Sequence, residues 1–143
     1  MESGYLLIQT GADHHGLVCL AAPEGPPPLP PAADPSGLLQ IRYAARFDDI
    51  DAALMHAHTA LRRSLVDVER RLYRTEVLQA VAAVDTIALR HRRIYLDPAL
   101  ENDQRLAAEI ARRDKSHRRN DLIWQGIGLT AAALLVAILL FGV

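Results

Sequence analysis

An apolar stretch at the C-terminal end of the chain restricts its possible folds. Residues 122–143 read LIWQGIGLTAAALLVAILLFGV, in which no side chain is charged and only Gln125 and Thr130 are polar. A helix rises about 1.5 Å per residue, so this stretch would span roughly 33 Å, close to the hydrocarbon thickness of a bilayer. A buried helix in so small a domain is rarely apolar on every side, and a signal peptide would lie at the N-terminus. We therefore expect one transmembrane helix.

The residues beside this stretch predict its orientation. Basic residues within about 15–20 positions of a span usually stay in the cytoplasm, where they also meet anionic lipid. Trp124 lies one turn inside the basic end, where an indole ring favours the interface. We expect a single-pass, tail-anchored protein of a bacterial inner membrane, with a cytoplasmic N-terminal domain and a periplasmic C-terminus. The predicted membrane-interface residues are Trp124 and the basic residues Arg112, Arg113, Lys115, Arg118 and Arg119.

Composition limits what the rest of the chain can be. About 120 residues remain outside the span, enough for one small domain with a modest core. The basic residues are almost all arginine, and alanine and leucine are abundant, which is typical of a GC-rich bacterial genome. The single cysteine, Cys19, rules out a disulfide within the chain and fits a reducing compartment. Residues 1–51 carry an acidic excess, and the membrane explains the basic residues near the span, so charge does not indicate nucleic acid.

Three segments have the composition of strands. Residues 4–10 and 17–21 are apolar runs joined by a glycine-bounded turn at residues 11–16, which predicts a hairpin. In residues 39–47, apolar and polar side chains alternate, which is typical of a half-buried strand. We expect these three strands to form a small antiparallel sheet. In the third strand, the face predicted to be buried consists of Leu39, Ile41, Tyr43, Ala45 and Phe47.

A proline-rich segment separates the second and third strands. Residues 23–35 hold seven of the eight prolines, and each proline removes a backbone donor and fixes φ, which excludes a helix or a central strand. We predict an extended surface loop over residues 22–37. The loop is either a stiff connector or a docking strip for an aromatic groove. In the second case its contact residues would be Pro26, Pro27, Pro28, Pro30 and Pro31.

Helical periodicity follows the third strand. Apolar residues recur at helical spacing over residues 50–65, and Asp48 or Asp49 can cap the first turn. The apolar residues within residues 66–74 predict a short extended segment. A second helix is predicted over residues 75–91, with its first residue as the N-cap.

The sequence predicts that a third helix begins after residue 97 and is the last element of the fold. Asp97 followed by Pro98 is typical of a capped first turn, and we expect one long helix that continues from there into the membrane. The predicted fold is α+β, with a small antiparallel three-stranded sheet, flanking helices and a single C-terminal transmembrane helix. Its parts are a globular domain at residues 1–95, a polar and basic juxtamembrane helix at 96–121, and the span at 122–143.

The order strand, turn, strand, loop, strand, helix resembles the GIY-YIG endonuclease superfamily, most of all its phage-type branch. The matching residues begin with Gly4-Tyr5-Leu6 in the first strand and include residues 16–21 in the second. They continue with IRYAARFDD at residues 41–49, ALMH at residues 53–56 and LYR at residues 72–74. The resemblance covers residues 4–90 and implies a nuclease-like domain.

Several residues depart from the pattern of that family. Its second motif places a tyrosine or lysine before an isoleucine-glycine pair, whereas residues 16–21 read GLVCLA. A catalytic arginine follows on a helix in the family, whereas no Arg or Lys precedes Arg42 here. The family's metal-binding glutamate lies one turn before the helix histidine, a position that Ala52 occupies. Phosphodiester cleavage needs a metal ligand and a cation for the developing charge, so we expect a catalytically inactive scaffold.

The remaining polar residues predict neither a metal site nor a cofactor. His14 and His15 lie in a turn, and His56 and His58 would point about 200° apart on a helix, so they cannot bind one ion together. The aspartates near the start of that helix are explained by capping. The sequence has no phosphate-binding glycine loop, no nucleophile elbow and no Cys-x-x-Cys pair.

Small residues are concentrated in the first half of the span. Gly128 and Ala132 are four residues apart, as are Gly126 and Thr130, and this spacing lets a second helix approach closely. We predict that Gly126, Gly128 and Ala132 are helix-packing residues. The bulky residues that follow suit contact with lipid or with a cofactor-rich surface.

Two functional interpretations follow from these features. In the first, the chain is a non-catalytic accessory subunit of a larger respiratory or photosynthetic membrane complex, which it contacts through its tail helix and cytoplasmic domain. In the second, it is a membrane-tethered nucleic-acid-binding or nuclease-like protein, which would need a basic groove and metal ligands. The acidic excess of residues 1–51 favours the first. A redox carrier is disfavoured because the sequence lacks haem and cluster ligands.

Overall fold

The chain consists of two units, Met1–Ile110 and Ala111–Val143. Its structure is a computed structural model that describes residues 2–11, 15–29 and 39–141, apart from the side chains of residues 117, 120 and 121. The first unit is an α+β domain, and the second continues a helix that begins in the first.

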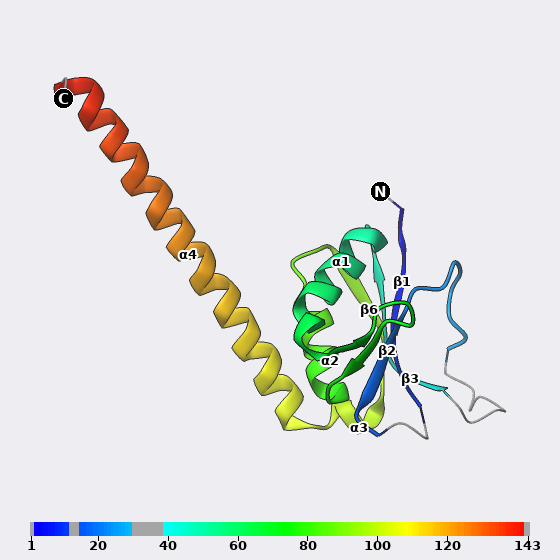
Figure 1. The fold of residues 1–143 in the computed structure, drawn as a ribbon. Coiled ribbons are helices and arrows are strands. Elements are labelled where there is room, and N and C mark those ends of the chain that lie inside the picture. Colours follow the sequence, from blue (N-terminus) through cyan, green and yellow to red (C-terminus); the bar gives the residue numbers. More distant parts are fainter. Residues whose placement is uncertain (1, 12–14, 30–38, 142–143) are drawn as a thin grey trace. The chain divides into compact units, whose positions relative to one another are not determined.

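A six-stranded antiparallel sheet forms the centre of the first unit (Figure 1). The three predicted strands are present as β1 (Gly4–Gly11), β2 (Leu17–Ala21) and β3 (Leu39–Phe47). The prediction of a three-stranded sheet is wrong, because neighbouring strands pair antiparallel in the order β4-β5-β2-β1-β3-β6. The additional strands are β4 (Leu65–Asp67), β5 (Leu72–Arg74) and β6 (His91–Leu96).

The predicted second helix ends early, and strand β6 begins at its last predicted residue, His91. Helix α2 (Val77–Asp85) stops early, and the hydroxyl of Thr86 donates to the carbonyl of Ala82 at 2.7 Å. Strand β6 then pairs with β3, whose other edge is bonded to β1. A helix that continued to His91 would remove this residue from its pairing with Phe47 and leave no connection to turn the chain back to β3, so long-range pairing outweighs local helical periodicity.

Helix α1 (Ile50–Leu61) begins where the aspartates predict. Asp49 is the N-cap, and its carboxylate accepts a hydrogen bond from the N–H of Ala52 at 3.0 Å. A 3₁₀ turn follows the helix, which is therefore shorter than predicted. The predicted cap of α2 is wrong, because Glu76 rather than Thr75 is the N-cap, and its side chain makes no capping hydrogen bond.

The main hydrophobic core lies between one face of the sheet and helices α1 and α2 (Figure 1). Alanines contribute much of the helix side, and Ala53, Ala57 and Ala80 are fully buried. Small side chains here let the helix backbones lie close to the sheet. The strands contribute Leu6, Ile8, Val18, Leu20, Tyr43, Ala45, Phe47 and Tyr73.

The opposite face of the sheet carries a smaller apolar cluster, to which a bulge in β3 adds one residue. The pairing of β1 with β3 changes register between Ile8 and Gln9, and Arg42 is the extra residue on β3. The bulge turns Ile41 out of the main core and into the second cluster. The predicted alternation of this strand therefore holds only from Tyr43 onward. The cluster contains Leu7, Ile41 and Ala44, with Ala21, Leu29 and Tyr95 packed against it.

Two helices replace the single long helix predicted after β6. Asp97 caps α3 (Pro98–Glu101) through its side chain, as the sequence predicted. Asn102 and Asp103 then interrupt the helix, because their side chains bond to nearby backbone groups. Helix α4 (Gln104–Phe141) begins after this interruption and continues without a break through the predicted span.

Candidate functional site

Helix α4 contains a segment that is long and apolar enough to cross a membrane. The segment Leu122–Leu140 has 19 residues and a mean hydropathy of 2.1, and none of it is buried against other described residues. The prediction of one candidate transmembrane helix is therefore confirmed by length and composition. The type of membrane and the orientation stay predictions.

The predicted helix-packing residues are small and exposed, but they lie on two sides of α4, because Gly126 and Gly128 are about 200° apart around the helix. A Cβ added at Gly126 or Gly128 would meet nothing within 4 Å beyond the backbone of its own helix. The hydroxyl of Thr130 donates to the carbonyl of Gly126 at 3.0 Å, so its hydrogen bond stays within the helix. Ala132 is exposed as well. The face of Gly128 and Ala132 can accept a second helix, but its role in packing stays a prediction.

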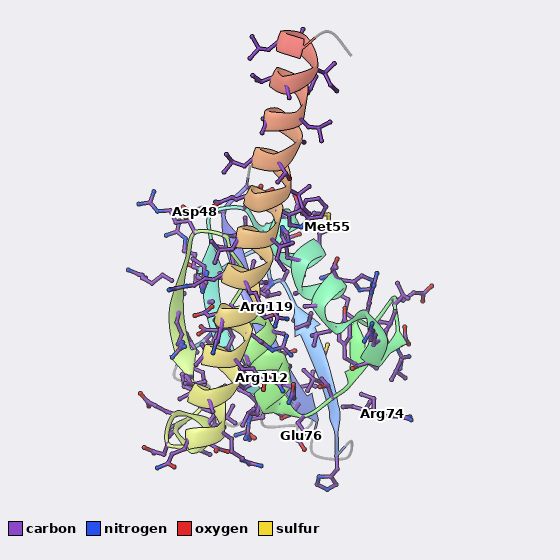
Figure 2. All side chains as sticks on the ribbon, turned by 90° about the vertical axis from the view of Figure 1, so that its left-hand side faces the viewer. Asp48, Met55, Arg74, Glu76, Arg112 and Arg119 are labelled. Carbon is purple, nitrogen blue, oxygen red and sulfur yellow. The ribbon has the colours of Figure 1, made fainter. Side chains whose placement is uncertain are left out.

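The predicted membrane-interface residues lie along α4, before and at the start of the apolar segment (Figure 2). Arg113 is half-buried, and Trp124 is 66% exposed. A basic region followed by an indole and then an apolar run fits a helix that enters a bilayer. The exposed basic residues are Arg112, Lys115, Arg118 and Arg119.

The described part of the proline-rich segment lies on the sheet face opposite the helices (Figure 1). Leu29 packs against the second apolar cluster and anchors this part of the segment. Pro26 and Pro28 are exposed and Pro27 is half-buried. The other predicted contact residues, Pro30 and Pro31, lie outside the described residues. The docking role of the loop stays a prediction.

Residues of the nuclease-like pattern lie on β1 and α1. Tyr5 is half-buried on β1, where it pairs with Arg46 of β3. Ala52 lies in the first turn of α1, with its N–H bonded to Asp49. Within residues 2–11, 15–29 and 39–141, no group of three or more His, Cys, Asp or Glu side chains could hold a metal ion. The resemblance to the endonuclease family stays a prediction.

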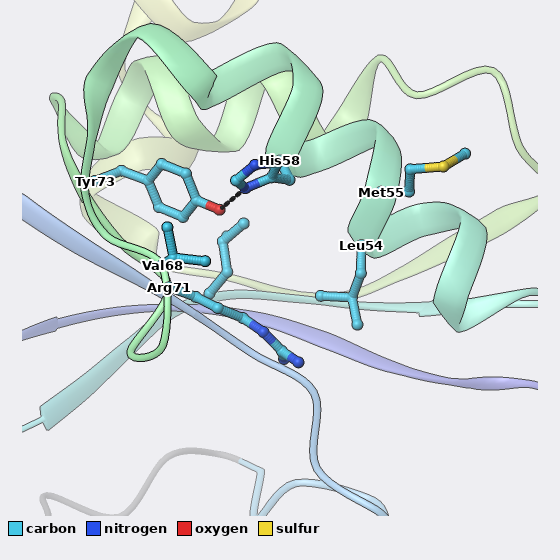
Figure 3. A pocket seen from close by; sticks show the side chains of 7 residues that line it. Leu54, Met55, His58, Val68, Arg71 and Tyr73 are labelled. Carbon is cyan, nitrogen blue, oxygen red and sulfur yellow. Dashed lines mark hydrogen bonds between the residues drawn. The ribbon is translucent and has the colours of Figure 1, made fainter.

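A cleft that the sequence did not predict lies beside α1 and the β4–β5 hairpin (Figure 3). Its volume is about 310 Å³. Met55 and Val68 lie at its mouth and are 62% and 66% exposed, which is high for large apolar side chains. Apolar walls with a few polar groups are typical of a binding pocket. The lining residues are Leu20, Leu54, Met55, His58, Val68, Arg71 and Tyr73.

A hydrogen bond between α1 and β5 holds one wall of the cleft. The hydroxyl of Tyr73 lies 3.0 Å from Nδ1 of His58 (Figure 3), and the two rings meet edge to face with centroids 6.2 Å apart. Tyr73 is only 1% exposed, whereas His58 is exposed. The buried hydroxyl therefore finds its partner in a side chain at the surface.

Arg71 brings a positive charge to the cleft. Its φ is +51°, in the left-handed region that few residues other than glycine adopt. Two backbone hydrogen bonds hold this conformation, because Arg71 N–H donates to Val68 O at 3.2 Å and Leu20 N–H donates to Arg71 O at 3.1 Å. The side chain of Arg71 extends toward Leu54 (Figure 3). The turn therefore directs the guanidinium along the cleft.

The charge of Arg71 acts on two neighbouring titratable groups. Burial raises the pKa of Tyr73, while Arg71 opposes that shift and Cys19 adds to it. Burial also raises the pKa of the Cys19 thiol, and Arg71 again opposes the shift. The Cys19 thiol donates to the carbonyl of Arg70 at 3.4 Å. Both groups stay neutral near pH 7, so Arg71 carries the charge on this side of the cleft.

A second polar cluster joins the end of α2 to β3 and β6. The Tyr43 hydroxyl donates to Oδ1 of Asp85 at 2.9 Å, and Arg93 donates to the same carboxylate through Nε at 3.1 Å and through its terminal nitrogen. His91 lies 4.0 Å from Asp85 and stacks on Phe47. Burial and Asp85 raise the pKa of Tyr43, and the bond to Asp85 raises the pKa of Arg93. These mutual contacts support the fold and leave no open site.

Comparisons with known proteins identify no relative of this chain. No protein-family model, no curated protein and no solved structure matches it. Its function must therefore be inferred from its own residues.

Proposed function

We propose that the chain is a non-catalytic accessory subunit of a larger protein complex in a bacterial inner membrane. The observation that carries this proposal is the exposed apolar segment Leu122–Leu140, with its mean hydropathy of 2.1. Such a surface is unfavourable in water, and lipid or an apolar protein surface must cover it. A helix anchored in this way keeps the α+β domain beside the membrane, where it can contact the same complex.

The small residues of the segment support contact with another helix. Gly128 has no side chain, and Ala132 lies one turn further on the same face, so a neighbouring backbone can approach closely there. Lipid tails are as apolar as the helix, so helices in a bilayer associate mainly through close packing and hydrogen bonds. Basic residues before the segment, Arg118 and Arg119 among them, would meet anionic lipid on the cytoplasmic side.

The residues at the family's catalytic positions support binding rather than nuclease activity. Ala52 has no carboxylate to hold a metal ion, and β2 reads LVCLA without a tyrosine or lysine. Phosphodiester cleavage needs a bound metal and a cation near the developing charge. A scaffold without these groups can still present its surfaces to a partner protein.

Solubilisation of the source membranes in a mild detergent tests this proposal. The full chain with an N-terminal affinity tag should migrate on a native gel well above the size of one chain in its micelle. Mass spectrometry of that band should show an integral membrane complex. A variant that ends before Leu122 is the control, and it should appear in the soluble fraction without the complex. Wild-type protein that migrates as a single chain, or that alkaline carbonate extracts from membranes, would contradict the proposal.

A further inference from the structure

We propose that the cleft beside α1 and the β4–β5 hairpin binds a peptide segment of a partner protein, in which an apolar side chain adjoins a carboxylate. This inference rests on the proposed function and deepens it, because it names the chemistry that the α+β domain recognises. Three features carry it: the apolar walls of the cleft, the charge of Arg71 and the exposure of the mouth.

The walls and mouth of the cleft select an apolar side chain. Leu20 is 2% exposed, Leu54 is half-buried, and Met55 and Val68 expose most of their surface at the mouth. Covering apolar surface releases about 25 cal/mol per Å², so an apolar ligand group gains free energy here. A volume of about 310 Å³ lies at the lower end of the range for ligand pockets. It suits one side chain better than a whole cofactor.

Arg71 supplies the charge that a carboxylate would match. Among the described residues it has no ion-pair partner, whereas its neighbour Arg70 lies 4.0 Å from Asp67. A guanidinium presents a planar fork of donors that fits a carboxylate with two parallel hydrogen bonds. The surroundings reinforce this preference, since residues 62–74 contain five arginines and only two acids, Asp67 and Glu69. An acidic ligand is therefore attracted before it binds.

Other classes of ligand fit the cleft less well. Proteins that hold single-stranded nucleic acid stack bases on exposed aromatic rings, but Tyr73 is only 1% exposed. A zinc ion would need further ligands beside His58, and the other lining residues supply none. An acyl chain of a lipid would extend beyond so small a volume. The exposed apolar side chains at the mouth instead favour a partner large enough to cover them.

Methyl NMR of the full chain tests this inference directly. The chain has two methionines, Met1 and Met55, so ¹³C-methyl labelling of methionine yields one signal from the mouth of the cleft and one internal control. The chain is placed in nanodiscs of neutral phosphatidylcholine. The probe is the acetylated and amidated peptide Gly-Ser-Leu-Glu-Ser-Gly. Matched peptides carry Ser in place of Leu or Gln in place of Glu.

The Met55 signal should shift in a saturable way with the probe, while the Met1 signal stays in place. Both matched peptides should bind at least about tenfold more weakly, as should the variants Arg71→Gln and Val68→Glu. Val68→Glu places a repelling carboxylate at an exposed position, so the fold should tolerate it. The matched control is Arg92→Gln, an exposed arginine on β6 at the opposite edge of the sheet, and it should bind as the wild type does.

Several results would overturn the inference. One is a Met55 signal that does not move at probe concentrations above about 1 mM. Another is equal binding of the Gln peptide or of the Arg71→Gln variant. A third is a shift produced by vesicles of anionic phosphatidylglycerol but not by the peptide, which would make the ligand a lipid headgroup. The NMR assay does not depend on the apolar span, so a negative result would not contradict the proposed membrane function. The native-gel experiment tests that function separately.

Discussion

The hydroxyl of Tyr43 donates a hydrogen bond to Oδ1 of Asp85 at 2.9 Å, and this bond fixes the last residue of α2 against β3. Arg93 pairs with the same carboxylate, and His91 lies 4.0 Å from it, both on β6. One carboxylate therefore connects a helix with two strands that are distant in the sequence. Its contribution to stability can be measured separately from any function.

Removing this carboxylate should destabilise the domain. Asp85→Ala is expected to lower the free energy of unfolding by about 2–4 kcal/mol, because the buried Tyr43 hydroxyl loses its acceptor and Arg93 loses its partner. The control Asp48→Ala removes a carboxylate that is 67% exposed and 3.9 Å from Arg90, and it should cost less than about 0.5 kcal/mol. Urea unfolding of the full chain in detergent, followed by circular dichroism, measures both. Equal effects of the two substitutions would refute this role for Asp85.

Tyr43 also makes the stability of the domain sensitive to alkaline pH. Burial, and then Asp85, raises the pKa of Tyr43 above its ordinary value of 10.0. The unfolded chain therefore releases the phenol proton at a lower pH than the folded chain does. Above about pH 10 the unfolded state binds fewer protons, so the free energy of unfolding falls as pH rises.

The variant Tyr43→Phe removes this contribution. It should be less stable than the wild type near neutral pH, because it loses the hydrogen bond to Asp85. Its urea midpoint should nevertheless fall less steeply than that of the wild type when pH is raised from about 9 to about 11. A midpoint that falls as steeply in the variant would show that Tyr43 is not the group responsible.

The left-handed backbone at Arg71 predicts that glycine is a more stable replacement at this position than a residue with a larger side chain. Arg71→Gly and Arg71→Gln both remove the guanidinium, but only glycine adopts a φ of +51° without steric cost. The glycine variant should therefore be more stable than the glutamine variant by about 1 kcal/mol. Thermal unfolding of the two variants makes the comparison. If glutamine is the more stable replacement, the turn after Val68 does not hold the strained conformation in solution.

The basic residues before the span predict its orientation. With Arg112, Lys115, Arg118 and Arg119 retained in the cytoplasm, a reporter fused after Val143 would lie in the periplasm. A C-terminal alkaline phosphatase fusion should be active, and a C-terminal fluorescent protein that folds only in the cytoplasm should be dark. The opposite pair of results would reverse the orientation. Replacing the four basic residues with Ser is the matched control and should weaken the bias.

Local signals account for the part of the fold that the sequence predicted. The signals for the pairing of the first two strands, for the alternation from Tyr43 onward and for the cap at Asp49 each act within a few residues, and these three features are present in the structure. Strand β6 reads HRRIYL, with arginines on a sheet edge and no clear alternation. Its pairing with β3 is a long-range contact. The sequence predicts an extended piece over residues 66–74, but β4 and β5 have only three residues each, too few to show a period.

The cleft could not be predicted for a related reason. Met55 comes from α1, Val68 and Arg71 come from the hairpin, and only the folded chain brings them together. Nothing in the sequence indicates a left-handed backbone at Arg71, since the usual signal is glycine or asparagine. One weak signal was present. Val68 stands between two acidic residues, Asp67 and Glu69, and an apolar side chain in such a polar stretch is exposed without contributing to the core.

Substitution of Gly128 tests the membrane-subunit account most directly. Gly128→Leu would hold a neighbouring helix away from α4 while keeping the span apolar, so the variant should still reach the membrane. We predict that partner protein recovered with it, measured by mass spectrometry after mild solubilisation, falls at least about tenfold, which corresponds to about 1.4 kcal/mol. The control Leu134→Ala, at an exposed position about 200° around the helix from Ala132, should retain the partner. If the Gly128→Leu variant recovers as much partner protein as the wild type does, this result contradicts the proposed packing role, and the helix is only a membrane anchor.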